Sequence, residues 1–305
     1  MKYIIGSSVE TDEIHLPDGR VMPNMPGGAG FYALAGLRIW CADVGIAGGI
    51  GPGYMDRHRD WYIRNQVATG GLHVRFDTTP TTIVTYFPDG DRTDVPNVGL
   101  DVFRQLDPTP EEIEALCGPE TRGVYLFKHL DRTFLERMVA MKYQYGFKLM
   151  WEISEDAAIP ENIPAFEQLL PEIDVFSINK KEALQLYATG SVEEAAGRLG
   201  AACPNWVFFR QGALGAYLLE GGRSHFCPSV PHAKVVDPTG GGNSSSAAVL
   251  YACCEGFDPK TAGVMGSVSA SFIIAQYGPP MDYPDGMRAQ AEQLVQKTLS
   301  EGGIG

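Results

Sequence analysis

Three consecutive glycines, Gly240, Gly241 and Gly242, lie between an apolar run and a helical pattern that begins at Asn243. Glycines at a turn from strand to helix leave backbone N–H groups accessible, and the helix that follows adds partial positive charge at its N-terminus. Such a turn binds anions, phosphate groups above all. The same glycines would also suit a tight turn without a ligand, so the spacing alone leaves both interpretations open. The P-loop pattern G-x-x-x-x-G-K-[ST] does not occur, which excludes that class of phosphate site.

Other residues that could do chemistry follow apolar, strand-like runs. Asn179 and Glu182 come after DVFSI, where they could organise a metal or could cap a helix and occupy its first turn. Lys128 and His129 follow VYLF, at the end where open parallel sheets place ligands. His129 is a candidate proton acceptor because it titrates near neutrality, although most such histidines are ordinary loop-edge residues. Asp12 is either a substrate contact or a solvated loop acid.

Four motifs occur in a fixed order along nearly the whole chain. They are GGAGFYALAG (27–36), NKKE (179–182), RQGALGAYLLEGG (210–222) and DPTGGGN (237–243). Together they resemble the ribokinase or PfkB family of sugar and nucleoside kinases, whose signature near the C-terminus is D-T-x-G-A-G-D. The other three resemble the paired glycines at the family's first helix, its N-x-x-E motif and its nucleotide-bordering hairpin. The resemblance implies a ribokinase-like fold.

Finer features resemble one branch of that family. Tyr32 after GGAGF, WEI (151–153), SINKKE and GGGN are together similar to a fungal killer-maintenance branch, which also carries GGGN in place of GAGD. Tyr32 replaces the Asn that is frequent in the family, which points to an aromatic or otherwise different substrate. The branch resemblance therefore predicts the fold better than the reaction.

The family resemblance implies ATP-dependent phosphorylation of a hydroxyl on a sugar, nucleoside or similar small molecule, with ATP and Mg²⁺ as cofactors. In the family, N-x-x-E organises Mg²⁺ and phosphate through water, and an early Asp grips sugar hydroxyls. Arg210 could reach phosphate or simply pair with an acid. The residues implied are Gly240, Gly241, Gly242 and Asn243 for the transferring phosphate; Arg210, Gly212, Gly215, Ser267 and Ser271 for the nucleotide; Asp12, Gly27, Gly28 and Tyr32 for the substrate; and Asn179 and Glu182 for Mg²⁺.

Asn243 stands where these kinases carry the Asp that takes a proton from the attacking hydroxyl. An amide cannot accept that proton at neutral pH, and a positioned base contributes roughly 10²–10⁴ in rate. Phosphoryl transfer depends mainly on positioning and charge stabilisation, so a slow kinase is compatible with Asn243. Two other hypotheses stay open. One is a protein that binds nucleotide without turnover and engages a partner, and the other is an enzyme with different chemistry that uses His129 or Glu152 as its acid–base group.

The elements that must position these residues are predicted from apolar runs that alternate with helical patterns. YIIG, VGIAGG, GVYLF, FKLMWEI, DVFSI and WVFFR are typical of strands. Their alternation with helical segments favours a mostly parallel central sheet with helices on both faces. Helices are predicted from Asn243 to Glu255 and, after Asp258 as N-cap, to about Tyr277.

Strand residues on both sides of turn chemistry at 88–91 predict an antiparallel hairpin over 73–95. In an otherwise parallel α/β protein, a hairpin early in the chain often forms a projecting lid. We therefore expect one ribokinase-like three-layer α/β domain over 1–305, with a small β lid around 10–20 and 73–95.

The bulk composition limits the class of partner and compartment. With 24 basic and 37 acidic residues the net charge is −13, and no basic stripe interrupts that excess. A small-molecule substrate is therefore expected, and a nucleic-acid or membrane partner is not. The six cysteines form no C-x-x-C pair and the N-terminus lacks the apolar run of a signal peptide, so we expect a cytoplasmic protein. A homodimer through the exposed hairpin is an open alternative to a monomer.

Overall fold

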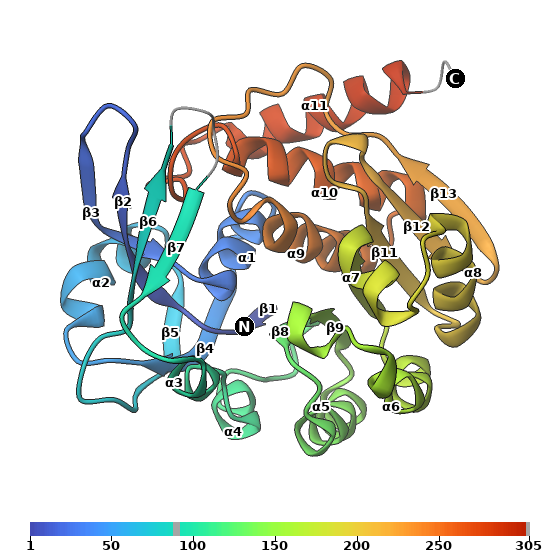
Figure 1. Ribbon diagram of the computed structural model, residues 1–305, viewed down its shortest axis with the longest axis horizontal. Helices are drawn as coiled ribbons and strands as arrows, with labels where there is room; N and C mark the ends of the chain where they lie inside the picture. Colours follow the sequence, from blue (N-terminus) through green and yellow to red (C-terminus); the bar gives the residue numbers. More distant parts are fainter. Residues whose placement is uncertain (88–91, 303–305) are drawn as a thin grey trace.

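Two β-sheets organise the chain in the computed structural model, which describes residues 1–87 and 92–302. Within these residues, the larger sheet has nine strands in the order β13-β12-β11-β10-β9-β8-β1-β4-β5 (Figure 1). Every pairing from β11 to β5 is parallel, and β12 and β13 are antiparallel at one edge. The prediction of a mostly parallel central sheet is confirmed. The strands are β1 (Tyr3–Gly6), β4 (Val44–Ile50), β5 (Ala68–Val74), β8 (Gly123–Lys128), β9 (Lys148–Ile153), β10 (Val175–Asn179), β11 (Trp206–Arg210), β12 (Ala216–Glu220) and β13 (Arg223–Cys227).

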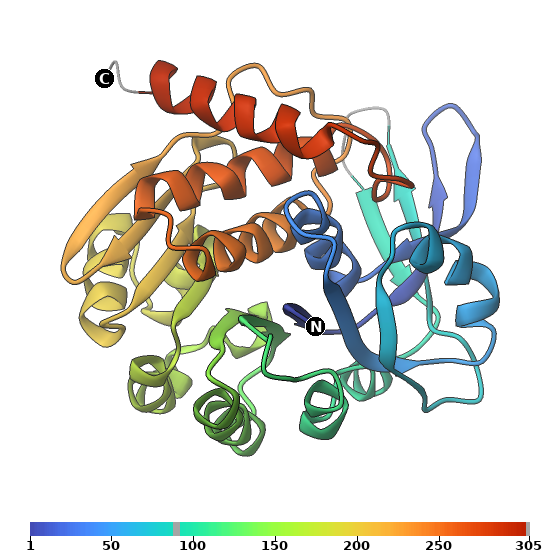
Figure 2. The ribbon, with the colours of Figure 1, turned by 180° about the vertical axis from the view of Figure 1, so that it is seen from behind.

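Helices cover both faces of this sheet, because its strands are apolar on both sides. Tyr3 and Ile5 of β1 belong to a core shared with residues of α1, α2, α9, α10 and α11, whereas Ile4 belongs to a core shared with residues of α4 to α8. Successive side chains of a strand point to opposite faces, so one short apolar run serves both cores. The three layers are visible from the front and from behind (Figures 1 and 2).

The helices are separated by short loops, and no α-helix of the described chain is long and apolar enough to cross a lipid bilayer. Short 3-10 turns accompany several of them. The helices are α1 (Ala29–Arg38), α2 (Tyr54–Arg64), α3 (Leu100–Gln105), α4 (Pro110–Glu114), α5 (Arg132–Tyr145), α6 (Ile163–Leu169), α7 (Lys180–Leu186), α8 (Val192–Ala202), α9 (Gly241–Cys254), α10 (Pro259–Ile273) and α11 (Met287–Glu301), with 3-10 turns η1 (Glu155–Ala157), η2 (Pro160–Asn162), η3 (Leu170–Glu172) and η4 (Gly212–Leu214).

The C-terminal helices follow the predicted pattern with shifted ends. Helix α9 begins at Gly241, before the predicted start at Asn243. Asp258 is the N-cap of α10, as predicted, and its side chain accepts a hydrogen bond from the N–H of Thr261. Helix α10 ends at Ile273, short of the predicted end, because the next carbonyl accepts hydrogen bonds from the segment that leads into the glycine turn. Helix α11 was not predicted.

A second sheet of four strands stands beside the first and is called the small sheet below. Its order is β3-β2-β6-β7, with β2 and β6 parallel and both outer pairs antiparallel. The antiparallel pair predicted over 73–95 corresponds to β6 and β7, while residues 73 and 74 end β5 of the larger sheet. The predicted turn at 88–91 lies outside the described residues. Strand β3 was missed, because its two prolines argue against a strand. The strands are β2 (Glu10–His15), β3 (Val21–Gly27), β6 (Thr81–Tyr86) and β7 (Arg92–Pro96).

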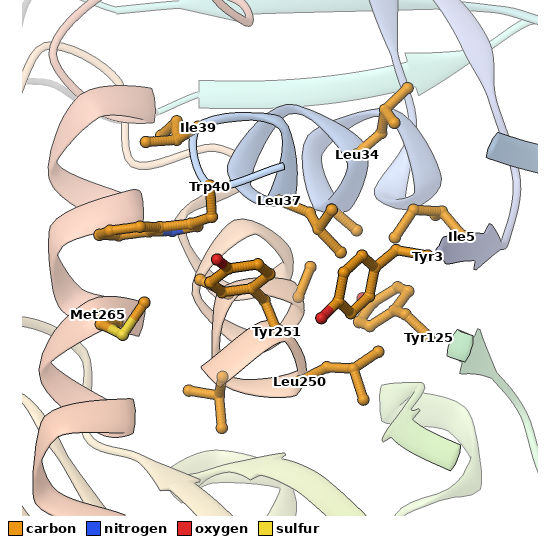
Figure 3. Packing of buried hydrophobic residues seen from close by; sticks show 14 of the residues in the cluster. Tyr3, Ile5, Leu34, Leu37, Ile39, Trp40, Tyr125, Leu250, Tyr251 and Met265 are labelled. Carbon is orange, nitrogen blue, oxygen red and sulfur yellow. The ribbon is translucent and has the colours of Figure 1, made fainter. Parts of the chain in front are cut away.

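Aromatic packing fixes α1 against α9 and α10, which sets the position of the glycine turn. Trp40, just after α1, stacks on Tyr251 of α9 with ring centroids 6.2 Å apart (Figure 3). Its indole N–H donates to the hydroxyl of Ser269 on α10, at 2.7 Å. Tyr3 of β1 packs on the same Tyr251 ring, with centroids 5.4 Å apart. These contacts hold the C-terminal half of α9, and the close approach of Gly36 on α1 to Ser244 fixes the start of the same helix.

Candidate active site

The glycine turn opens helix α9 at the edge of the central sheet. Gly240 is the N-cap and adopts a left-handed conformation with φ of 74°, which favours glycine. Asp237 shapes the turn from inside, since its Oδ1 accepts hydrogen bonds from the backbone N–H and the hydroxyl of Thr239 at 2.9 and 2.5 Å. The N–H of Gly241 donates to the carbonyl of Pro238 at 3.3 Å. The next N–H groups of the first helical turn, those of Gly242 and Asn243, are the donors suited to an anion.

Two side chains lie so close to this turn that only glycine fits. A Cβ at Gly240 would clash with the ring of Tyr32, and a Cβ at Gly242 would clash with Nη1 of Arg210. Tyr32 comes from α1 and Arg210 from the end of β11, so the turn is bounded by a ring on one side and a guanidinium on the other. The glycines therefore serve close approach as well as backbone conformation.

Asn243 is tied to a buried carboxylate. Its Nδ2 donates to Oε1 of Glu152 at 3.2 Å and to the hydroxyl of Tyr125 at 3.3 Å. The Tyr125 hydroxyl in turn donates to Oε2 of Glu152 at 2.8 Å. Because a carboxylate only accepts hydrogen bonds, the NH₂ group of Asn243 must face Glu152, which leaves the amide oxygen for other partners. Burial raises the pKa of Tyr125 well above its usual range, and the adjacent Glu152 raises it further.

Arg210 lies between two carboxylates, one from β9 and one from the first turn of α7. Its Nη2 is 2.9 Å from Oε1 of Glu152 and 3.8 Å from Oε2 of Glu182. Its Nε is buried and has no hydrogen-bond partner among the described residues. Pairing with an acid is thus the observed arrangement, while the guanidinium also borders the glycine turn at Gly242.

Asn179 and Glu182 form a capping box at the start of α7. The Asn179 side chain accepts from the N–H of Glu182 at 2.9 Å, and Glu182 accepts from the N–H of Asn179 at 2.8 Å. Burial raises the pKa of Glu182, an effect that Arg210 opposes. No group of three acidic, histidine or cysteine side chains in the described chain is arranged to hold a metal by itself. One carboxylate can hold Mg²⁺ that also binds nucleotide phosphates, so Glu182 fits a metal that arrives with its nucleotide, whereas the Asn179 side chain and Glu152 are occupied by protein donors.

A pocket of about 360 Å³ lies between the small sheet and the glycine turn. Its wall on one side is formed by Thr239, Gly240 and Asn243, and on the other by residues of β2, β6 and β7. Gly28 and Tyr32 close it from α1. The pocket therefore brings together the residues expected at the phosphate with residues expected at the substrate.

Asp12 lines this pocket from β2 and is only 5% exposed. Its carboxylate packs directly on Gly27, where a Cβ would clash. Gly28 has φ of 88° and a Cβ there would approach the backbone of β2. Burial raises the pKa of Asp12 well above its usual range, and the nearby charges of Glu10 and Asp94 raise it further. The paired glycines Gly27 and Gly28 therefore allow close packing against Asp12 and against the backbone at the start of its strand.

The small sheet contacts the glycine turn directly. Tyr86 of β6 shares a hydrogen bond of 3.1 Å with the hydroxyl of Thr239, and Arg92 of β7 contacts the same hydroxyl. Nη1 of Arg92 also lies 4.0 Å from the buried Asp237 carboxylate. Burial raises the pKa of Tyr86, and Asp237 adds to that effect. The small sheet is therefore docked on the turn in this structure.

The residues expected at the nucleotide are spread over two places. Ser271 lines a wider pocket of about 830 Å³, between residues 230–234 and the helices α10 and α11. Ser267 lies one turn earlier on α10 and is not among the described residues that line that pocket. Gly212 and Gly215 lie in the turn between β11 and β12, both with positive φ. Of these four residues, Ser271 is the one placed in a pocket.

His129 lies away from Asn243. Its Nδ1 is 3.3 Å from Oδ2 of Asp107, which also accepts from Nζ of Lys128 at 2.8 Å. Neither His129 nor Lys128 is among the described residues that line the pocket at the glycine turn. The arrangement is that of a local ion-pair cluster at the end of β8.

Sequence reasoning missed several members of this site. Tyr125 is a buried strand residue whose type resembles core, and its pairing with Glu152 depends on the order of β8 and β9 in the sheet. Glu10 could have been found, since it lies two residues from Asp12 on a strand and so faces the same side. Arg92 and Asp94 follow the predicted turn at 88–91 and alternate along a predicted strand. That pattern predicted their place in the lid but did not indicate that they line a pocket.

Comparisons with known proteins show the family and the fold of the chain. The profile of the pfkB family carbohydrate kinases matches residues 20–285. A cytidine kinase of Thermococcus kodakarensis is 22% identical over 282 residues, which cover 91% of this chain and 98% of that protein. A structure assigned as a ribokinase II from E. coli, in complex with ATP and Mg²⁺, superposes with a TM-score of 0.75 at 19% identity over 97% of this chain and 98% of that one. The nucleoside kinase of Burkholderia thailandensis, in complex with inosine, gives a TM-score of 0.73 at 18% identity over 98% of both chains.

Proposed function

The chain belongs to the pfkB family of carbohydrate kinases and has its ribokinase-like fold, and from that premise we propose that it transfers a phosphoryl group from ATP to a hydroxyl of a small molecule. The acceptor class is a sugar, a nucleoside or a related compound, as the kinases to which the chain is similar indicate. The residue assignments below, and the resemblance to the fungal killer-maintenance branch, are part of this proposal, as is the cytoplasmic location.

One observation carries the proposal. The N-terminus of α9 and the buried Asp12 face the same pocket of about 360 Å³, from opposite walls. A helix N-terminus at a glycine turn binds phosphate, and a buried carboxylate binds hydroxyl groups. A phosphoryl donor and a hydroxyl acceptor bound at these two walls would meet beside Asn243.

The donor side of the site uses backbone amides and one guanidinium. The N–H groups of Gly242 and Asn243 point to the transferring phosphate, with Gly240 and Gly241 shaping the turn. Arg210 borders the turn and has a buried Nε without a partner among the described residues, which supports a contact with phosphate once nucleotide is bound. Preorganised donors of this kind stabilise the charge that develops in the transition state.

The nucleotide base has its best-supported position in the pocket of about 830 Å³ that Ser271 lines. Ser267, Gly212 and Gly215 border the path from that pocket to the turn in this proposal. Mg²⁺ bound with ATP would neutralise phosphate charge, and Glu182 is the carboxylate that would hold it. Asn179 holds Glu182 in place through the capping box.

The acceptor hydroxyl is oriented by Asp12 and by the amide oxygen of Asn243. That oxygen can accept a hydrogen bond from the hydroxyl but cannot take its proton at neutral pH. A loose transition state needs little basic assistance until late in the reaction, so transfer proceeds slowly rather than failing. The small sheet acts as a lid on the pocket, through Tyr86 and Arg92, and excludes water from the phosphate.

The outer face of the small sheet supports the homodimer interpretation. Ile83 of β6 and Val95 of β7 are cross-strand partners and are 40% and 57% exposed. Exposed apolar side chains on a sheet surface favour self-association. Replacing Ile83 by glutamate should shift a dimer to monomers in sedimentation velocity; a wild type that sediments as a monomer at all concentrations would contradict this interpretation.

A binding protein without turnover is the second candidate, and the contacts of Asn243 favour it. Its amide is held by Glu152 and Tyr125, so no carboxylate of this turn faces the acceptor. The third hypothesis gains no support. Glu152 is 1% exposed and its oxygens accept from three donors, and His129 is paired with Asp107 away from the pocket.

The test combines nucleotide binding with product formation. Calorimetry with ATP and Mg²⁺ measures binding, and ADP release over a panel of sugars and nucleosides measures transfer. The kinase proposal expects binding, and ADP release that rises with one class of acceptor and is lost in Asp12→Ala. Binding without acceptor-dependent ADP release would favour the binding protein, and absence of nucleotide binding would contradict both.

A further inference from the structure

The pocket at the glycine turn holds more acidic than basic charge. Glu10, Asp12 and Asp94 line it, and Arg92 is the one basic residue among the described residues of its wall. The guanidinium of Arg92 lies 3.2 Å from the Asp94 carboxylate and 4.0 Å from that of Asp237. One guanidinium thus faces three carboxyl groups in this wall.

Asp12 indicates that a donor is missing from the pocket. Its side chain is 5% exposed, and its Oδ1 has no hydrogen-bond partner among the residues that the structure describes. A buried carboxylate oxygen without a donor is unfavourable, and native proteins rarely retain one without a ligand or another reason. A ligand that brings both a hydrogen-bond donor and positive charge would resolve both deficits.

Glu10 stands beside Asp12, since residues two apart on a strand face the same side. Its Oε2 accepts from the hydroxyl of Thr82 on β6 at 2.6 Å. Burial raises the pKa of Glu10 to about 7, and the charge of Asp94 contributes. The ring of Tyr32 lines the same pocket, and an aromatic face favours a cation near it.

The charged groups around these two carboxyls come from β7 and the glycine turn, while α1, β6 and α3 contribute uncharged side chains to the wall. Asp94 and Arg92 face them from β7, and Asp237 from the glycine turn. With both carboxyls ionised the sum of these side-chain charges is negative and attracts a cation, while Arg92 and the N-terminus of α9 oppose that attraction.

We propose that the acceptor bound in this pocket carries a positively charged amino group, held by Glu10 and Asp12, next to the hydroxyl that is phosphorylated. The inference rests on the proposed function, because it names the class of acceptor for that same pocket. Amino sugars and amino alcohols belong to this class. A neutral polyol would give Asp12 its donor but would leave the negative charge unbalanced.

The test compares pairs of small molecules that differ by an amino group in place of a hydroxyl. The probes are D-glucosamine against D-glucose and serinol against glycerol, with N-acetyl-D-glucosamine as an uncharged amide control. Calorimetry without nucleotide measures binding at about pH 6. A hydrogen-bonded charge pair is worth about 1.5–3 kcal/mol, so the amine of at least one pair should bind roughly 10- to 100-fold more tightly than its partner.

Proton release gives a second readout. The ammonium should favour the ionised carboxyls, so binding at about pH 6 should release protons, measured by titration in two buffers of different ionisation enthalpy. Glu10→Gln should reduce amine affinity and proton release together, and the loss of affinity should be larger for the amine than for its hydroxyl partner. Asp94→Asn, at a more exposed position, tests the same charge if Glu10→Gln does not fold, and Asp18→Asn removes an exposed carboxylate beyond the pocket as the matched control.

The outcomes separate this inference from the kinase proposal. Tighter binding of an amine that is lost in Glu10→Gln and retained in Asp18→Asn would support it. No amine binding more tightly than its hydroxyl partner would overturn it, even if ADP release with neutral acceptors establishes the kinase. Amine binding without any ADP release would support recognition of the amine and count against phosphoryl transfer.

Discussion

Replacing Asn243 by aspartate restores the acid that kinases of this family carry, but here it places the new carboxyl beside another one. The Nδ2 atom that would become an oxygen lies 3.2 Å from Oε1 of Glu152. At an effective dielectric constant of about 20, two like charges at that separation repel by about 5 kcal/mol. Arg210, 2.9 Å from the same oxygen, offsets part of that repulsion. The remainder raises the pKa of the new carboxyl from ~3.9 toward ~8. At neutral pH the pair would then share a proton, and the new carboxyl would not act as a base.

We therefore expect Asn243→Asp alone to gain little activity near pH 7 and to gain more as the pH rises toward ~8. Adding Glu152→Gln removes the repulsion at nearly constant shape, and the double variant should gain roughly 10²–10⁴ in kcat over Glu152→Gln alone. The assay is ADP release with the best acceptor between about pH 6 and pH 9. Mass spectrometry should confirm that the wild-type Asn243-Ser244 bond has not deamidated, since that change would create the acid by accident.

Stability supplies a readout that does not need turnover. The raised pKa in the folded state means that the new carboxyl is tolerated below ~4 and costs stability progressively as the pH rises to ~8. Relative to wild type, Asn243→Asp should lose several kcal/mol over that window, about the size of the repulsion, and the double variant should not. A single variant that gains full activity at pH 7, with wild-type pH dependence of unfolding, would refute the reasoning.

Three further predictions concern the turn, the lid contact and the pocket. Gly240→Ala should lower the free energy of unfolding, measured by denaturant titration, by about 2–4 kcal/mol, because it combines a left-handed backbone with a clash against the Tyr32 ring. The control Gly222→Ala, which has a similar positive φ but open space around it, should lower it by only about 1–2 kcal/mol. Equal losses would show that the protein relieves the clash. Tyr86→Phe removes a hydrogen bond to the turn worth about 1 kcal/mol, so kcat/KM should fall about 5-fold. Tyr143→Phe, on the exposed surface, is the control and should leave kcat/KM unchanged. An unchanged kcat/KM in Tyr86→Phe would show that this hydrogen bond does not contribute to catalysis. For Glu10, a pKa of about 7 when folded against 4.5 otherwise means that ligand-free wild type binds more protons folded and so loses stability as the pH rises from 4.5 to 7. Glu10→Gln should escape that loss, on the order of 3 kcal/mol; parallel pH profiles of the two proteins would contradict the assignment.

The parts of the fold that sequence reasoning predicted are those with strong local signals. The apolar runs at β1 and β4 form strands buried on both faces, and Asp258 caps α10. Helix α11 carries a mixed pattern after a run of prolines, and β3 contains Pro23 and Pro26. At α11 and β3 the local sequence provides no helix or strand signal, and the secondary structure is determined by contacts with the rest of the chain.

The candidate site divides in the same way. The glycine turn was predicted because its chemistry is contained in consecutive residues. The contacts of Asn243 could not be, since they depend on β8 and β9 lying side by side under α9, and strand order is not written in local sequence. The sequence left Arg210 between two interpretations, a contact with phosphate and a pair with an acid; its partner Glu152 lies on β9, two strands away from β11 in the sheet, and that placement also depends on strand order.

The hydroxyl of Thr239 is the point where the small sheet meets the glycine turn. A ligand that displaces the small sheet from this hydroxyl also exposes the glycine turn to solvent. A ligand that stabilises the contact keeps the turn covered. In the kinase that we propose, movement of the small sheet away from Thr239 and exposure of the glycine turn would therefore be a single event.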